Sequence, residues 1–140
     1  MRRRIVGTSL ALAIGLTGAA LAGGVEIGRR EYLAACAQCH GLEGRGDGIM
    51  APFLTVPAPD LTTIRRDSGG VFPAGVIYEI IEGGGSLALH GGSEMPAWGD
   101  RFSVHAYAEL GWPHAEADRA AFVRARILAL VEYLASIQAE

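Results

Sequence analysis

Residues 36–40 read Cys36-Ala37-Gln38-Cys39-His40 and contain both cysteines of the 140-residue chain. The spacing C-x-x-C-H is that of covalent haem c attachment. If the segment is helical, the two cysteines and His40 project from one face, because they lie three and four residues apart. Two thiols can then reach the vinyl groups on one edge of a porphyrin while the imidazole binds the iron. The stretch therefore predicts one haem c per chain, attached at Cys36 and Cys39, with His40 as an axial ligand.

Other uses of this cysteine pair fit the sequence less well. A disulfide leaves His40 without a role, and a thioredoxin-like motif needs a βαβ context that the surrounding sequence lacks. A zinc site needs a fourth ligand, usually from a second pair of cysteines or histidines. The remaining histidines are scattered rather than paired: His90, His105 and His114. Haem attachment is therefore the favoured interpretation.

The second axial position of the iron decides between electron transfer and chemistry on a small molecule. Met95 is the best candidate, because it lies in the glycine-rich segment 91–99 and Pro96 holds it in an extended conformation. Met50 lies only ten residues after His40, a position from which the opposite face of the haem is difficult to reach. His90 is the alternative ligand. Met95 could also be an ordinary core residue that binds no iron.

The N-terminus has the three parts of a secretory signal peptide. Three arginines at positions 2–4 precede an uncharged apolar run, residues 5–22, which ends in the small-residue site Ala20-Leu21-Ala22. We expect cleavage after Ala22, which leaves a signal peptide of residues 1–22 and a monohaem domain of residues 23–140 in the periplasm. An uncleaved membrane anchor over residues 5–22 is the alternative, since this length just spans a bilayer. Membrane contact is expected only in that case.

Charge and length limit the classes of function. All 12 basic residues are arginines, and removal of residues 1–22 leaves nine of them against 15 acidic residues, a formal charge of −6. A domain this acidic is not expected to bind nucleic acid or anionic lipid. The mature chain of 118 residues, 17 of them glycine, forms one small domain with a modest core.

The hydrophobic pattern predicts an all-α fold without internal repeats. We expect helices over residues 26–39, 73–81 and about 115–137, where apolar residues recur at helical spacing. The pattern allows a further short helix within residues 101–110. From 41 to 71 the content of Gly, Pro and Asp forbids long regular elements.

The chain resembles the class I cytochromes c over most of residues 23–140. The similar stretches are 39–48, 57–62 and 95–99. In that family a small residue eight positions before the first motif cysteine and an aromatic residue four before it pack against a Leu-x-x-aromatic pair near the C-terminus. The matching positions here are Gly28, Tyr32, Leu130 and Tyr133. The resemblance implies a small all-α cytochrome c fold of about four helices, whose long loops wrap one covalently bound haem.

The expected function is electron transfer rather than catalysis. With His40 and Met95 in both axial positions, the iron can change between Fe(II) and Fe(III) with little rearrangement. The expected partners are a redox protein donor and acceptor, without a small-molecule substrate. Since the chain has no lysine, the partner contact is expected to involve a basic partner or a small apolar patch. The alternatives are a haem c subunit of a dehydrogenase or reductase complex and, less favoured, a gas-binding or peroxidatic haem protein.

Two features depart from the family pattern. Many members carry a proline just after the glycine-rich turn, where a backbone carbonyl accepts the Nδ1 proton of the haem histidine. Ile49 stands there in this chain, so the identity of the carbonyl that orients His40 is open. The segment 101–118 is also longer than the family implies. We interpret it as a surface excursion, with a partner-docking flap as the alternative.

A few further side chains are candidates for haem contacts or turns. The Trp98 indole could donate to a haem propionate, and otherwise it packs beside the ring edge. Arg65 or Arg66 could pair with a propionate. Asp47 and Asp60 are expected to cap turns, given their glycine and proline neighbours.

Overall fold

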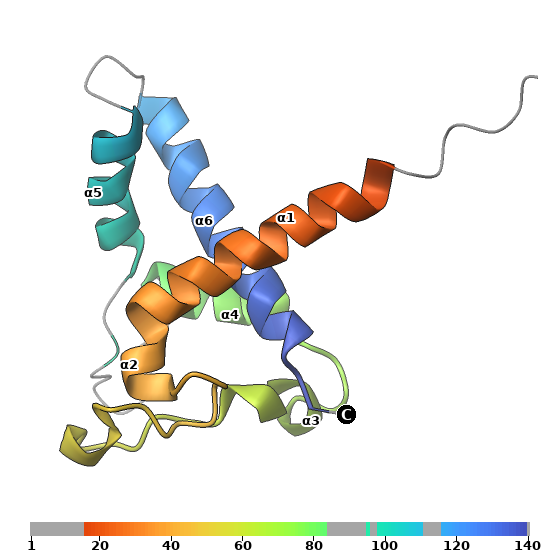
Figure 1. Ribbon diagram of the computed structural model, residues 1–140, viewed down its shortest axis with the longest axis vertical. Helices are drawn as coiled ribbons and strands as arrows, with labels where there is room; N and C mark the ends of the chain where they lie inside the picture. The colour runs from red at the N-terminus through yellow and green to blue at the C-terminus, as the bar shows by residue number, and fades with distance from the viewer. Residues whose placement is uncertain (1–15, 84–94, 96–97, 111–115, 140) are drawn as a thin grey trace, which may run out of the picture.

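Four helices form the body of the protein in the computed structural model, which describes residues 16–83, 95, 98–110 and 116–139. Helices α1 (Leu16–Glu31) and α6 (Glu116–Ser136) cross, and α5 (Trp98–Leu110) packs along α6 (Figure 1). Helix α4 (Ala74–Glu82) contacts both α5 and α6. The described residues contain no strand, and the predicted all-α cytochrome c fold is confirmed.

The C-x-x-C-H motif ends the first helical run. After α1 the chain makes one π-helical turn (Tyr32–Cys36) and continues into α2 (Ala37–His40). The run is therefore longer than the predicted helix over residues 26–39. A π turn inside an α-helix often marks a functional site, and here it leads directly into the motif.

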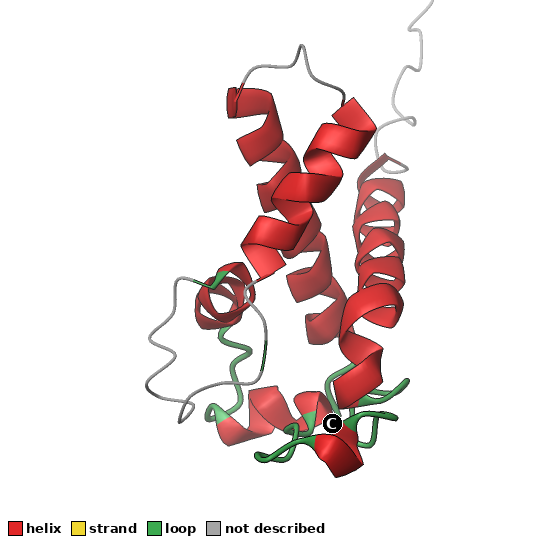
Figure 2. Ribbon diagram, turned by 90° about the vertical axis from the view of Figure 1, so that its left-hand side faces the viewer, coloured by secondary structure: helices red, strands yellow, loops and turns green. Residues whose placement is uncertain are grey.

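The segment from Gly41 to Pro73 is mostly loop, as its composition predicts. It holds only two short 3-10 turns, Ala51–Phe53 and Leu61–Thr63, and the short α3 (Ile64–Asp67). These elements lie together at one end of the molecule, below the longer helices (Figure 2).

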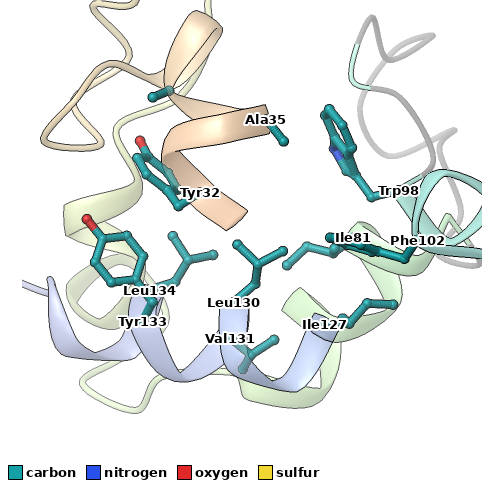
Figure 3. Packing of buried hydrophobic residues seen from close by; sticks show 11 residues of the cluster. Tyr32, Ala35, Ile81, Trp98, Phe102, Ile127, Leu130, Val131, Tyr133 and Leu134 are labelled. Atoms are coloured by element: carbon teal, nitrogen blue, oxygen red, sulfur yellow. The ribbon is translucent and has the colours of Figure 1, made fainter. Parts of the chain in front are cut away.

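The crossing of α1 and α6 depends on Gly28. A Cβ atom at this position would lie 2.5 Å from the carbonyl carbon of Ala129 and 2.9 Å from the Cβ of Tyr133, so the helices can approach this closely only at a glycine. Next to it the rings of Tyr32 and Tyr133 pack with centroids 5.2 Å apart, and Leu130 is buried beside them (Figure 3). The predicted contact between the two ends of the chain is confirmed.

The core extends from this crossing to α5. Its largest fully buried side chains are Tyr32, Phe102, Ile127 and Leu130. Phe102 belongs to α5, where Ala106 is also buried. The interpretation of residues 101–118 as a surface excursion is therefore wrong for the helical part, which is packed against α6. Residues 111–115 lie outside the described part of the chain.

The N-terminal part of α1 spans the predicted domain boundary. Helix α1 begins at Leu16 and continues through the predicted cleavage position after Ala22. Residues 1–15, which include the three arginines, lie outside the described residues. Among the helices that are described, none is both long and apolar enough to cross a membrane. The division into residues 1–22 and 23–140 stays a prediction.

Candidate haem-attachment site

The motif residues lie where the helical run meets the loop layer. Cys36 ends the π turn, and Cys39 and His40 belong to α2. Cys36 and Cys39 are partly buried and are not joined by a disulfide, and the His40 side chain is buried. Before a thioether bond forms, burial raises the pKa of the Cys36 thiol to about 12, so the unattached side chain is neutral at physiological pH.

The loop after the motif holds the motif backbone through main-chain hydrogen bonds. The N–H of Gly46 donates to the carbonyl of His40 at 2.8 Å, and that of Gly48 donates to the carbonyl of Cys39 at 3.2 Å. The N–H of Met50 donates to the carbonyl of Gln38 at 2.8 Å. A Cβ on Gly48 would lie 2.6 Å from the carbonyl carbon of Cys39, which explains why the closest approach is made by a glycine. The motif is thus held rigidly by its own loop.

Within the described residues, one backbone group contacts the imidazole of His40. Its Nδ1 lies 3.2 Å from the carbonyl oxygen of Pro59. Since a carbonyl only accepts, Nδ1 carries the proton and Nε2 has a lone pair for a metal. Burial lowers the pKa of His40, against the opposing effect of the Pro59 hydrogen bond, and this favours the neutral, ligating form. The carbonyl left open by the sequence is therefore that of Pro59, ten positions beyond Ile49.

Trp98 supplies the clearest observation that these residues suit a haem. Its side chain is buried at one side of the core, away from Tyr32 and Tyr133 (Figure 3). Its indole Nε1 is buried without a hydrogen-bond partner in the described part of the chain. Such an orphaned donor costs about 1–3 kcal/mol unless an acceptor satisfies it, and a haem propionate is an acceptor of the right kind.

Met95 lies against the same core. Its side chain is half-buried and packs on the hydrophobic cluster that contains Trp98. Residues 84–94 and 96–97 lie outside the described part of the chain, and they include the rival ligand His90. The structure therefore places the Met95 side chain beside the core.

The other charged candidates for a haem contact have partners elsewhere. The Nη2 of Arg65 donates to the carbonyl of Ala135 at 3.3 Å, and the Nε of Arg66 pairs with Asp67 at 2.8 Å. Both arginines are exposed, so the structure does not support either as a propionate partner. Within the described ranges, no group of three or more His, Cys, Asp or Glu side chains is placed to hold a metal ion.

Two features of the site could not be predicted from side-chain type. One is the Pro59 carbonyl described above. The other is the hydroxyl of Tyr32, which donates to the carbonyl of Gly41 at 2.6 Å. The aromatic residue at this position was predicted to pack, and nothing in the sequence signalled a hydrogen bond to the residue after His40.

Comparison with known proteins places the motif in a family. Residues 23–111 match the family model described as "Cytochrome C oxidase, cbb3-type, subunit III". The matched region covers more than half of the chain and contains residues 36–40 as well as Met95. Neither the comparison with curated proteins nor that with solved structures gave a match.

Proposed function

The chain belongs to the family of cbb3-type cytochrome c oxidase subunit III, a family of c-type cytochromes with covalently bound haem c, and from this premise we propose that it is a periplasmic one-electron carrier with His40 and Met95 as axial ligands. Haem c supplies an iron that takes up and releases a single electron. Membership of the family indicates electron transfer by haem c. The periplasmic location, the two iron ligands and the two attachment cysteines are our proposal.

The observation that carries the ligand assignment is the geometry of His40. Its Nδ1 proton is used by the Pro59 carbonyl, so Nε2 is the only ring nitrogen free for iron. A hydrogen bond of this kind fixes the ring orientation and raises the basicity of the ligand. Cys36 and Cys39 precede His40 on the same helical segment, in the order that two thioether bonds and one iron bond require.

Met95 completes the proposed ligand set. It packs against the core beside the buried Trp98, and the chain before it is rich in glycine. A thioether is a soft ligand that favours the reduced iron and raises the reduction potential. With both axial positions filled by protein, the iron has no open site for a substrate, which is what an electron carrier needs.

Absorption spectra of protein matured in a periplasm test this assignment. We expect a sharp reduced α band and, in the oxidised protein, the weak far-red charge-transfer band that reports a Met–Fe(III) bond. Met95→Ala is expected to abolish that band and to let carbon monoxide bind the reduced protein. Met50→Ala is the matched control, since Met50 is a more exposed methionine on the loop after the motif. A high-spin wild-type spectrum, or one unchanged in Met95→Ala, contradicts the proposal and favours an open-site or His90-ligated haem.

Export explains how the haem becomes attached, because c-type maturation takes place outside the cytoplasm. We propose that residues 1–22 direct export and are then removed. The intact mass of the mature protein tests this directly. A mass that begins at Gly23 supports cleavage after Ala22, and a mass that retains residues 1–22 supports the membrane anchor.

The contact with a redox partner is proposed to be partly apolar. The loop that follows the motif carries exposed apolar side chains, with exposed fractions of 75% for Leu42, 79% for Ile49 and 74% for Phe53. This loop is tied to the motif by the backbone bonds of Gly46, Gly48 and Met50, so its apolar residues lie near the attachment site. Small apolar contacts are typical of weak electron-transfer encounters.

A second candidate follows from the description of the family. The same haem domain could serve as an electron-transfer subunit within a terminal oxidase complex rather than as a free carrier. Purification under mild conditions separates the two. A protein that elutes at the size of one chain supports the carrier, and copurification of further redox subunits in fixed ratio supports the subunit.

A further inference from the structure

The hydroxyl of Tyr32 makes a hydrogen bond that the packing of its ring does not require. Tyr32 is fully buried, with its ring against Tyr133, and a phenylalanine ring would fill the same space. The hydroxyl points away from the cluster (Figure 3) and donates to the carbonyl of Gly41 at 2.6 Å. A buried hydroxyl costs free energy unless it is paired. Its presence is therefore tied to Gly41, the residue directly after His40.

A short series of backbone hydrogen bonds connects Gly41 to the segment that contains Pro59, the acceptor of the His40 imidazole. The Gly41 carbonyl also accepts from the N–H of Gly44 at 3.3 Å, and the Gly44 carbonyl accepts from the N–H of Leu61 at 2.6 Å. Leu61 lies two residues after Pro59, whose carbonyl accepts the Nδ1 proton of His40 at 3.2 Å. Tyr32 thus connects the helix crossing to the segment after His40 and, through Leu61, to the segment that carries Pro59.

The close packing of these loops makes the connection stiff. A Cβ on Gly44 would lie 3.1 Å from a methyl of Ile137 and 3.6 Å from the Tyr32 hydroxyl. Asp60 fixes the segment after Pro59, because its carboxylate accepts from the N–H of Thr62 at 2.8 Å. A shift of the Gly41 backbone is therefore expected to move the Pro59 carbonyl as well.

We propose that Tyr32 is a positioning residue for His40, whose hydroxyl fixes Gly41 and through Gly44 and Leu61 keeps the Pro59 carbonyl on the imidazole Nδ1. The proposal rests on the proposed function, in which His40 binds the haem iron. The Pro59 hydrogen bond makes the imidazole a stronger donor and so stabilises Fe(III). Loss of the Tyr32 hydroxyl weakens that bond and therefore raises the reduction potential.

The test compares the wild-type holoprotein with two single-hydroxyl variants. Tyr32→Phe keeps the ring and removes the bond to Gly41. Tyr133→Phe is the matched control, since it removes a hydroxyl from the other ring of the same pair and leaves the Tyr32–Gly41 bond in place. The measured quantities are the exchange rate of the His40 Nδ1 proton in the reduced protein, followed by NMR, and the reduction potential.

We expect Tyr32→Phe to speed the exchange of the Nδ1 proton about two- to tenfold, the factor that corresponds to one net hydrogen bond, and to raise the potential. Tyr133→Phe is expected to match the wild type in both. Unchanged values in Tyr32→Phe, equal changes in both variants, or faster exchange without a change in potential overturn the positioning role alone. A wild-type spectrum without a His-ligated low-spin haem contradicts the proposed function, and the positioning role with it.

Discussion

At the level of single residues, the buried indole N–H of Trp98 needs an acceptor, and a haem propionate could supply it. It lacks an acceptor within the described residues, and the guanidinium of Arg101 lies 5.2 Å from the ring centroid on the ring face. Trp98→Phe keeps an aromatic ring and removes the donor. If a propionate accepts this proton, its loss costs the holoprotein about 1.5–3 kcal/mol, the range for a hydrogen bond to a charged group. Urea unfolding of the oxidised holoprotein measures the loss.

Because the smaller ring also reduces packing, a second measurement isolates the hydrogen bond. A propionate that loses a donor becomes less acidic, so the pH-dependent part of the reduction potential should move to higher pH in Trp98→Phe. A loss of stability with an unchanged pH profile would mean that Trp98 only packs against the ring edge.

Asp60 is expected to make the stability of the folded protein depend on pH. Its carboxylate accepts from the N–H of Thr62 at 2.8 Å and from the Thr62 hydroxyl at 2.6 Å, and these bonds hold the pKa of Asp60 below its usual range. A depressed folded-state pKa contributes stability that is present above the unfolded-state pKa and is lost as the pH falls through the folded-state value. Asp60→Asn keeps an acceptor but cannot titrate, so its urea midpoint should fall less on acidification than that of the wild type. Parallel curves for the two proteins would contradict this.

The candidate site residues can be proposed from side-chain type, whereas the backbone groups that contact them cannot. The C-x-x-C-H spacing, the capping role of Asp60 and the packing of Tyr32 depend on side-chain type and can be inferred from it. The acceptor for His40 is a backbone carbonyl, which every residue possesses. Only the path of the chain decides that it belongs to Pro59 rather than to a residue near Ile49.

At the level of secondary-structure elements, the contact between α1 and α6 depends on one position. Gly28→Ala would place a Cβ against the Ala129 carbonyl and the Tyr133 Cβ, so the helices must move apart. Overpacking of this kind typically costs about 1–3 kcal/mol. We expect a lower urea midpoint for the holoprotein.

A glycine in an open position of another helix provides the control. A Cβ on Gly75 of α4 meets nothing within 4 Å, so Gly75→Ala should be neutral or stabilising by up to about 1 kcal/mol through helix propensity. Equal effects of Gly28→Ala and Gly75→Ala would show that the crossing tolerates a methyl group. The close approach of α1 to α6 would then not depend on glycine.

The elements that sequence patterns predicted well are those with regular apolar spacing. Helix α6 presents Ile127, Leu130 and Leu134 to the core at intervals of three and four residues, and its predicted bounds agree with the structure. Among the described side chains of α5, Trp98, Phe102 and Ala106 are buried. The sequence pattern allowed a helix within residues 101–110 but did not reveal that this face packs in the core. The π turn before the motif left no sequence signal, because it is a hydrogen-bond pattern that any residue type can adopt.

At the level of the whole molecule, the crossing of the two chain ends is also held by a partly buried ion pair. The Nη1 of Arg126 on α6 lies 2.6 Å from the Oε1 of Glu31 on α1, and the guanidinium packs over the ring of Phe122. Both partners of the pair lie within residues 23–140, as do Gly28 and Tyr32. The proposed removal of residues 1–22 therefore leaves these contacts intact.

The net charge of the proposed mature domain predicts how ionic strength affects its electron transfer. Nine arginines against 15 acidic residues give a formal charge of −6, and such a field is screened within about 10 Å at 0.1 M salt. Oxidation of the reduced protein by the hexacyanoferrate(III) anion should therefore become faster with added salt, and oxidation by the tris(1,10-phenanthroline)cobalt(III) cation should become slower. Stopped-flow rates at several salt concentrations measure both.

The opposite salt dependence would mean that the local charge beside the haem outweighs the net charge. Arg101 is the residue to substitute in that case, because its guanidinium lies over the Trp98 ring and its side chain is exposed. Arg101→Gln should then reverse the salt dependence for hexacyanoferrate(III). If the net charge governs the encounter, Arg101→Gln adds one negative unit to an already repulsive field and only steepens the salt dependence. The sign of the wild-type slope thus decides whether a redox partner meets an acidic molecule or a basic local patch, and the variant shows which charges produce it.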